Sequence, residues 1–142
     1  MGELTNEEIR ANCRAYLAEV AEKDARTKTL GWLLDLLEEQ PMFDVVAFDV
    51  GGHPSQCGSY RGDYAALGIS ARPEQTMVRQ LLGTLRRVNG KRFDGYKGGS
   101  YLMHRETKLY VATWGTTEGS RRIVGVRWER DTQTVVLTTE EA

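Results

Sequence analysis

The chain has 142 residues, enough for one domain and marginal for two, and its 40% apolar and 27% charged residues are typical of a soluble globular protein. No apolar run approaches the roughly 20 residues that cross a bilayer, and the acidic, polar start predicts no secretory signal. The formal net charge of −1 hides an uneven distribution. Residues 1–50 carry 11 acids and 5 bases, whereas residues 51–142 carry 9 acids and 14 bases.

Two helices are predicted in the acidic first part. Thr5 followed by Glu8 is the sequence pattern of a capping box, and the first helix is predicted over residues 5–23. Its apolar positions form one stripe, which consists of Ile9, Cys13, Tyr16, Leu17, Val20 and Ala21. The second helix, over residues 29–39, is apolar nearly all round and is expected to be the more buried. Trp32 is expected to pack in the core or, alternatively, to contact a partner.

The next segment predicts strands. Residues 43–50 are β-branched and aromatic and predict a strand, and the Gly- and Ser-rich residues 51–58 predict a loop. Residues 59–69 are predicted to return as one strand, with both of its tyrosines and Gly62 on the same face. Glycines inside a strand indicate a bulge or the close approach of another group.

A third helix is predicted to begin near Pro73 and Thr76 and to end at Gly90. Its apolar stripe consists of Val78, Leu81, Leu82, Leu85 and Val88. The rest of the chain predicts strands at 100–103, 107–114, 122–128 and 134–138, a loop at 115–120 and a frayed end at 140–142.

This order of elements favours the α+β class. We predict a single domain over residues 1–142, with an antiparallel or mixed β-sheet of about five to six strands. Two helices lie in residues 1–40, and one helix is inserted between the strands of residues 41–139. The helices are expected to cover one face of the sheet and to leave the other open to a ligand or a second subunit.

Glycine is unusually frequent, with 15 residues, 13 of them between Gly51 and Gly125. They concentrate in residues 51–62 and 95–99, and both clusters contain tyrosine and a cation. In the first cluster, Tyr60, Arg61 and Tyr64 predict a ligand site, because a guanidinium grips phosphate and tyrosine rings stack on a base. The alternative is a strand with packed tyrosines and an Arg61–Asp63 pair.

The second cluster predicts further ligand contacts. Glycine-rich turns present backbone N–H groups to anions, and nearby cations add positive charge. The candidate residues are Arg92, Tyr96, Lys97, Gly98 and Gly99. The alternative is a tight turn between helix and sheet.

Two other features of the sequence are candidates for ligand contacts. Trp114, beside a glycine at a strand end, is a candidate for stacking on a ligand or, alternatively, for core or edge packing. The residues Arg86, Arg87, Lys91, Arg92 and Lys97 form a basic stretch. The acidic first part of the chain lowers the expectation of nucleic acid and favours a small anionic ligand.

Neither a metal nor a cofactor is expected. The two histidines and two cysteines do not stand at ligand spacing. Cys13 and Cys57 are expected to be free thiols of a reducing compartment, with a reactive Cys57 near Arg61 as the alternative. We assign no catalytic residue, because the sequence contains neither a G-x-S-x-G motif nor an ordered Ser/His/acid set.

Several segments resemble a family of small, functionally uncharacterised proteins of tailed bacteriophages. The resemblance rests on residues 58–64, 90–91, 93–103, 107–115 and 123–126, and the Tyr-Lys-Gly-Gly of residues 96–99 is its most distinctive part. It spans roughly residues 43–138 and implies a phage protein in the bacterial host cytoplasm. It carries over no catalytic residue.

The leading hypothesis is a non-enzymatic protein that binds a small phosphate-containing, nucleotide-type ligand and could thereby sequester a host defence signal. Arg61, Lys97 and Arg92 would hold phosphate, and Tyr60, Tyr64, Tyr96 and Trp114 would stack. A homo-oligomer is expected. The alternatives are a protein-interaction module that inhibits a host protein through the acidic helices, and an enzyme that cleaves a nucleotide or nucleic acid.

Overall fold

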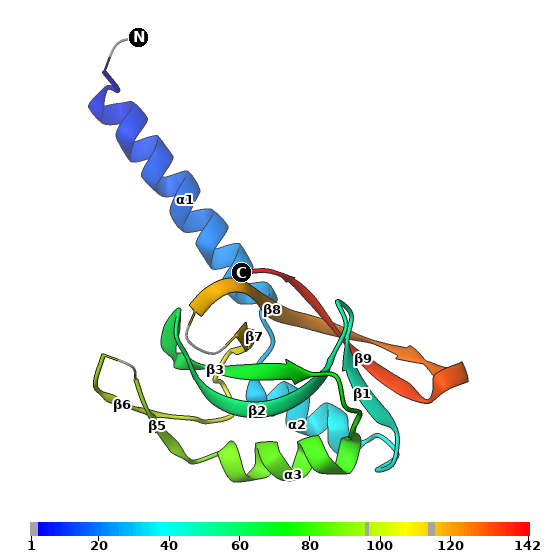
Figure 1. The fold of residues 1–142 in the computed structure, drawn as a ribbon. Coiled ribbons are helices and arrows are strands. Elements are labelled where there is room, and N and C mark those ends of the chain that lie inside the picture. Colours follow the sequence, from blue (N-terminus) through cyan, green and yellow to red (C-terminus); the bar gives the residue numbers. More distant parts are fainter. Residues whose placement is uncertain (1–2, 96, 114–115) are drawn as a thin grey trace.

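The computed structural model describes residues 3–95, 97–113 and 116–142, within which the chain forms three α-helices and two β-sheets (Figure 1). In chain order the elements are α1 (Asn6–Arg26), α2 (Leu30–Glu38), β1 (Val45–Phe48), β2 (His53–Tyr60), β3 (Asp63–Arg72), β4 (Thr76–Met77), α3 (Val78–Val88), β5 (Arg92–Asp94), β6 (Ser100–Leu102), β7 (Leu109–Thr113), β8 (Thr116–Glu129), the 3-10 helix η1 (Arg130–Thr132) and β9 (Thr134–Glu141). The predicted α+β class is confirmed, with more strands than the predicted five to six.

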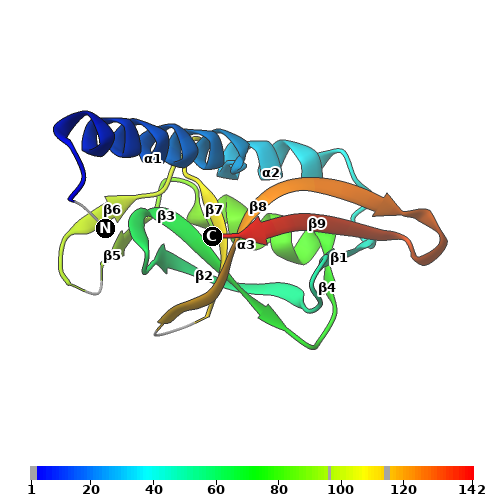
Figure 2. The ribbon, with the colours of Figure 1, turned by 90° about the horizontal axis from the view of Figure 1, so that it is seen from above.

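The larger sheet is mixed and has seven strands in the order β2-β3-β7-β8-β9-β1-β4. The pairs β1–β9 and β3–β7 are parallel and the other neighbours antiparallel, while β5 and β6 form a separate hairpin. The sheet curls until its edges meet, where the Thr76 hydroxyl in β4 donates to the Pro54 carbonyl in β2 at 2.6 Å. β8 and β9 extend beyond the rest of the sheet as a long hairpin (Figure 2).

The core lies between this curled sheet and the helices α2 and α3, which pack side by side (Figure 1). Thr29 caps α2 by accepting a hydrogen bond from the Trp32 backbone N–H at 3.2 Å. The apolar positions predicted for the third helix are all buried, and they meet the inward side chains of the strands. Trp32 is half-buried and packs against the core, as one of its two predicted alternatives requires.

The predictions for residues 51–69 are wrong in two respects. Residues 53–58, expected in a loop, belong to β2, and the single strand expected at 59–69 is interrupted by a turn at Arg61 and Gly62. A Cβ atom on Gly62 would lie 2.7 Å from the Tyr60 ring, so this position needs glycine. Gly68 meets the expectation of a close approach, since an added Cβ would lie 2.9 Å from Ala112 Cβ on the neighbouring strand.

Two further boundaries differ from the prediction. β8 already begins at Thr116, inside the expected loop, and β9 continues to Glu141, inside the segment expected to fray. The start of β8 pairs with β7, where Thr116 lies opposite Thr113, and the end of β9 pairs with β8, where Glu141 lies opposite Arg121. Strand pairing therefore overrides the local composition.

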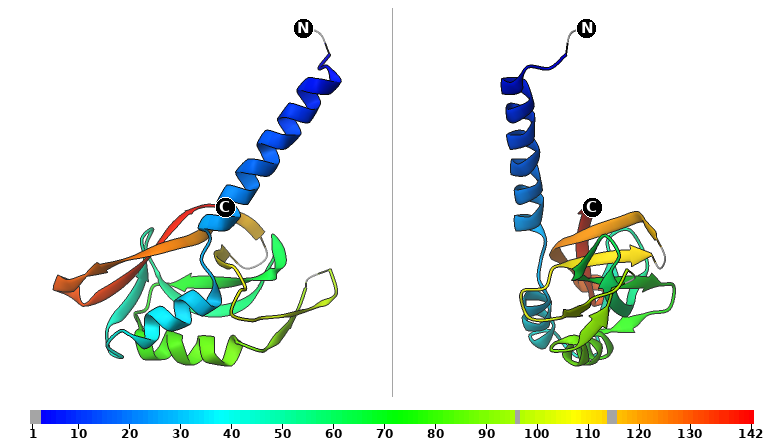
Figure 3. Two further views of the ribbon diagram at one scale, coloured as in Figure 1. Left: turned by 180° about the vertical axis from the view of Figure 1, so that it is seen from behind. Right: turned by 90° about the vertical axis from the view of Figure 1, so that its left-hand side faces the viewer.

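Helix α1 stands away from the rest of the fold (Figures 1 and 3). Its predicted capping box is confirmed: the Thr5 hydroxyl accepts from the Glu8 N–H at 3.1 Å, and the Glu8 carboxylate accepts from the Thr5 N–H at 3.2 Å. None of its residues is buried, so its apolar stripe faces solvent. Among the described residues, no helix combines the length and apolarity needed to cross a membrane.

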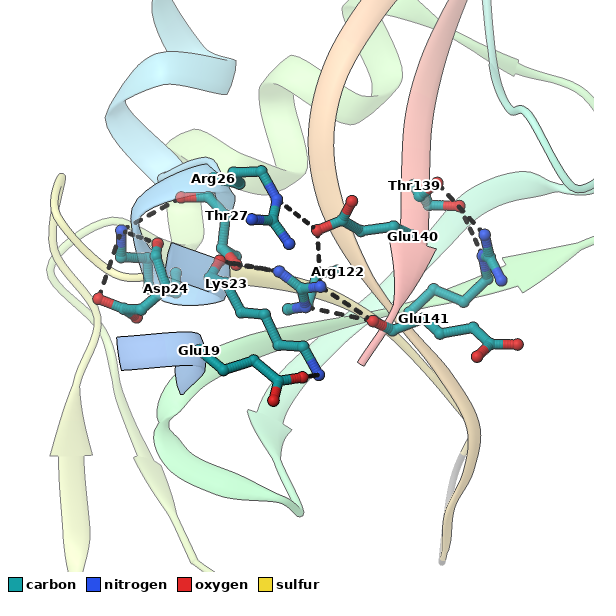
Figure 4. Close-up of polar contacts among 11 residues, drawn as sticks. Glu19, Lys23, Asp24, Arg26, Thr27, Arg122, Thr139, Glu140 and Glu141 are labelled. Carbon is teal, nitrogen blue, oxygen red and sulfur yellow. Dashed lines mark hydrogen bonds and ion pairs between the residues drawn. The ribbon is translucent and has the colours of Figure 1, made fainter. Parts of the chain in front are cut away.

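The C-terminal end of α1 is held by Arg122 of β8 (Figure 4). The Arg122 side chain is 5% exposed, lies 2.6 Å from the Glu140 carboxylate, and donates to the carbonyls of Lys23 at 2.8 Å and Glu141 at 3.0 Å. Arg26 donates to the same Glu140 oxygen at 3.0 Å. The last turn of α1 is therefore joined to β8 and β9.

We predict that Arg122→Ala lowers the free energy of unfolding by about 3 kcal/mol, because it removes the buried guanidinium with its hydrogen bonds to the Lys23 and Glu141 carbonyls and its ion pair with Glu140. Urea unfolding at neutral pH measures the change. Arg127→Ala is the matched control on the same strand. Its side chain is about half exposed and pairs with Glu129, so the loss should stay within about 0.5 kcal/mol. Equal losses for the two variants would contradict the anchoring role.

The hydrogen bond from Arg26, with the charge of Arg122, holds the pKa of Glu140 below its ordinary value of 4.5. A carboxylate whose pKa is lower in the folded state stabilises the fold above the unfolded pKa and loses that contribution as pH falls. We therefore predict that the wild type is more stable than Glu140→Gln at neutral pH and that this difference disappears as pH falls below 4.5. Urea unfolding of both proteins across this range checks it, and a constant difference would contradict it.

Candidate anion-binding groove

A groove lined with cations runs between β2 and α3. One part, of about 510 Å³, is lined by Gln56, Arg72, Arg79, Thr84 and Arg87 among others. It shares Gln56, Thr84 and Arg87 with a second hollow of about 370 Å³, which adds Lys91 and Phe93. We use the name β2–α3 groove for the surface defined by Gln56, Arg72, Arg79, Thr84, Arg87 and Lys91.

The periodicity of α3 places its polar residues along this groove. Because the apolar residues of α3 are buried in the core, Arg79, Gly83 and Arg87 recur every four residues on a solvent-facing row. The two arginines start two helical turns apart, about 12 Å along the axis. Gly83 lies between them and has no side chain, so the helix surface is open at this point. The nearest atom to an added Cβ would be Arg87 Nη1 at 3.7 Å.

The cations of the groove take part in no ion pair among the described residues. In the part of the chain that the structure describes, no carboxylate oxygen lies within 4.0 Å of a side-chain nitrogen of Arg72, Arg79, Arg87 or Lys91. Arg72 donates to the Thr76 hydroxyl at 3.0 Å and to the Gln75 carbonyl at 3.2 Å. These neutral acceptors fix the direction of its guanidinium and leave its charge uncompensated.

An aromatic ring accompanies a cation toward each end of the groove. The Arg79 guanidinium lies 5.4 Å from the centre of the exposed Phe43 ring. The Lys91 ammonium lies 4.9 Å from the centre of the half-buried Phe93 ring. Cation–π contacts of this kind position the cations, and the rings offer flat apolar surface beside them.

The residues predicted from the first glycine cluster lie at the β2–β3 turn. Tyr60 is buried and stacks on Tyr110 with ring centres 4.2 Å apart and an interplanar angle of 6°. Arg61 is exposed at the turn, and Tyr64 is half-buried. Tyr60 also lines a hollow of about 470 Å³ at the C-terminal end of α1. A stacking role for Tyr60 toward a ligand would require its pair with Tyr110 to open.

The two predicted clusters do come together, at one end of the molecule. The Tyr64 ring lies 5.8 Å from the Tyr101 ring, and both rings lie 3.0 Å from the position of an added Cβ on Gly95. This contact joins the β2–β3 turn to the turn between β5 and β6. The glycine at position 95 is therefore explained by two rings that pack on its backbone.

The second cluster has the geometry of a tight turn, one of its two predicted alternatives. Gly98 and Gly99 have positive φ angles of 98° and 85°, and the Gly98 N–H donates to the Gly95 carbonyl at 3.0 Å. The Gly95 N–H in turn donates to the Gly99 carbonyl at 3.1 Å. Two backbone donors of the cluster are thus used inside the turn.

The remaining predicted residues are exposed or outside the described residues. Lys97 is exposed near the tip of this turn and Arg92 is exposed on β5, whereas Tyr96 and Trp114 lie outside the described residues. The structure therefore puts Arg61, Arg92 and Lys97 on the surface and not on the β2–α3 groove. Their ligand contacts stay a prediction.

Sequence reasoning missed Arg72, Arg79 and Gln56. Part of the signal was present, because Arg79, Gly83 and Arg87 recur every four residues on the polar face of the predicted third helix. The basic stretch noted in the sequence also contains Arg87 and Lys91. Gln56 of β2 could not be identified in this way, because it joins the groove only through the packing of β2 against α3.

The groove contains Cys57 but no ligand set for a metal. Among the residues described, no three His, Cys, Asp or Glu side chains gather in a way that could hold a metal ion. Burial raises the pKa of Cys57 to about 12, so its thiol stays protonated near neutral pH. A nucleophilic role for this cysteine is therefore disfavoured.

Comparisons with known proteins do not point to a function, so the proposed function rests on the geometry of the groove. No protein-family model, no curated protein and no solved structure matches this chain.

We predict that the folded protein, at a dilution at which single chains prevail, shows one fast-reacting thiol with a chromogenic disulfide reagent at mildly alkaline pH. Cys13 is exposed on α1, whereas Cys57 is partly buried with its pKa near 12. Cys13→Ser should remove the fast phase and Cys57→Ser should leave it, while urea should expose both thiols. Fast labelling of native Cys13→Ser would contradict the assignment.

Proposed function

We propose that the protein binds a small phosphate-containing, nucleotide-type ligand in the β2–α3 groove. The observation that carries the proposal is the presence of four cations along one groove whose lining, within the described residues, includes no Asp or Glu. Like charges held together raise the energy of the unliganded surface, and a bound polyanion removes that cost. Arginine forks also match the geometry of phosphate oxygens.

The shape and lining of the groove favour an elongated ligand with an aromatic part. Its cations lie on β3, on α3 and beyond the end of α3, so a single compact anion cannot contact all of them. The Thr84 hydroxyl and the Gln56 amide add neutral hydrogen-bonding groups between the charges. Phe93 lines one end and offers a surface on which a base can stack.

The lining favours binding over cleavage. Within the described chain, the groove residues donate hydrogen bonds and positive charge and include no carboxylate or imidazole that could activate a water molecule. The groove is therefore suited to hold phosphate. This distinguishes the proposal from the enzymatic alternative, which needs a general base within reach of the ligand.

The setting of this activity is also part of the proposal. The resemblance to small phage proteins supports a role in the bacterial host cytoplasm, where a nucleotide binder would sequester a host defence signal. The alternative of an interaction with a host protein draws on a different surface, the exposed face of α1. A homo-oligomer is compatible with both, because the groove and α1 use separate residues.

We predict that Arg79→Gln with Arg87→Gln weakens binding of ATP or ADP-ribose by at least about 30-fold, because two charge-assisted contacts are lost. Isothermal titration calorimetry at two salt concentrations measures the affinity. The matched control is Arg14→Gln with Arg130→Gln, which removes two exposed arginines elsewhere and should leave the affinity unchanged.

A panel identifies the class of ligand. Tripolyphosphate, ATP, ADP-ribose, a cyclic dinucleotide and a short single-stranded oligonucleotide are compared by thermal shift. Stabilisation by nucleotides beyond that by tripolyphosphate supports the proposal. A preference for the oligonucleotide, with a steep dependence on salt, would replace it with nucleic-acid binding. Absence of any shift at millimolar concentration would overturn it.

A further inference from the structure

Helix α1 presents an apolar stripe that no part of the fold covers. The stripe consists of Ile9, Cys13, Tyr16, Leu17, Val20 and Ala21, and Tyr16 and Leu17 are 66% and 64% exposed. An isolated helix of this length is marginally stable in water, and most helical stability in proteins comes from packing of an apolar face. The contacts of α1 with the fold are confined to its last turns, near Lys23 and Arg26.

The spacing of the stripe is that of a coiled-coil seam. Ile9, Cys13, Tyr16 and Val20 are separated by four, three and four residues, which is the alternation of d and a positions in a heptad. This sequence of intervals is the same from either end. In two antiparallel copies, Ile9 therefore lies opposite Val20 of the second copy and Cys13 lies opposite its Tyr16. The two-fold axis between the copies makes each of these contacts occur twice.

The charged residues beside the seam favour antiparallel over parallel pairing of two α1 helices. In a parallel pair, residues five apart at g and e positions face one another, and this brings Glu19 against Asp24 of the second copy on both sides. In the antiparallel pair, Arg10 faces Leu17 and Asn12 faces Glu19. Within the helical span the antiparallel direction thus avoids the repulsion of like charges.

The C-terminal end of α1, which we call its foot, supplies a further contact for the antiparallel pair. Leu4 precedes α1 and is 57% exposed, and in the antiparallel register it reaches the last turn of the second copy. There, the hollow of about 470 Å³ is lined by Val20, Tyr60 and Tyr110 among others. The two folded bodies lie at opposite ends of the pair, because α1 projects away from its own body (Figure 3).

We propose that the protein forms a dimer through antiparallel pairing of α1 with α1 of a second copy. Each copy buries the stripe of the other along the seam, and each helix start rests on the foot of the other helix. The β2–α3 groove takes no part in this contact, so dimerisation and ligand binding are separate properties.

Sedimentation equilibrium of the full chain tests the association. The wild type should be dimeric from micromolar to hundreds of micromolar concentration, and Tyr16→Glu should raise the dissociation constant at least about tenfold. Ala18→Glu is the matched control, because it adds the same charge to the opposite, exposed face of α1. A monomeric wild type, or equal effects of the two variants, would overturn the proposal.

Disulfide trapping tests the direction. With Cys13 replaced by Ser, the double variant Ile9→Cys with Val20→Cys should cross-link two chains under mild oxidation, whereas Ile9→Cys alone should not. Cross-linking by Ile9→Cys alone would show a parallel pair and would overturn the antiparallel proposal. Far-UV circular dichroism of every variant checks that the fold is retained.

Discussion

The buried guanidinium of Arg122 is the contact on which the placement of α1 depends. Burial of an arginine is costly unless its donors find acceptors, and Arg122 finds the Lys23 carbonyl, the Glu141 carbonyl and the Glu140 carboxylate. The Lys23 carbonyl belongs to the C-terminal end of α1, where the helix dipole favours a cation. One side chain therefore ties a helix end to two strands, and it fixes the direction in which the apolar stripe of α1 is presented.

A second constraint, the curl of the large sheet, creates the β2–α3 groove. The parallel pairing of β1 with β9 places β4 at one edge of the sheet, and the curl brings this edge to β2 at the other. The chain enters α3 directly from β4, so the helix must start beside β2. Thr76 at this junction donates to Pro54 and accepts from Arg72. The Thr76 hydroxyl thus joins the two edges of the sheet and also orients the guanidinium of Arg72.

The helices could be predicted from the sequence because their signals are local. Caps at Thr5 and Thr29 and the spacing of leucines in α3 need no knowledge of distant residues. The sequence does not predict β2, because Pro54, Gly58 and the two glycines just before the strand match the composition of a loop, and its pairing with β3 outweighs that composition. The groove was seen only as a basic stretch, because Arg72 and Gln56 join it through tertiary packing. Likewise, the stack of Tyr60 on Tyr110 unites strands that are 50 residues apart in sequence.

The uneven charge of the chain acquires a physical meaning in the fold. Acids of the first 50 residues pair with bases of the remainder, as Asp35 does with Arg105 and Glu38 with Arg86. Arg86 and Arg87 are adjacent on α3, but a step of about 100° round the helix turns one toward α2 and the other toward β2. Glu38 of α2 pairs with Arg86, whereas Arg87 donates to the Thr84 hydroxyl and lines the groove opposite Gln56 of β2. The face of α3 that lines the groove therefore keeps its positive charge, because the acid that α2 supplies pairs with Arg86 on the other face.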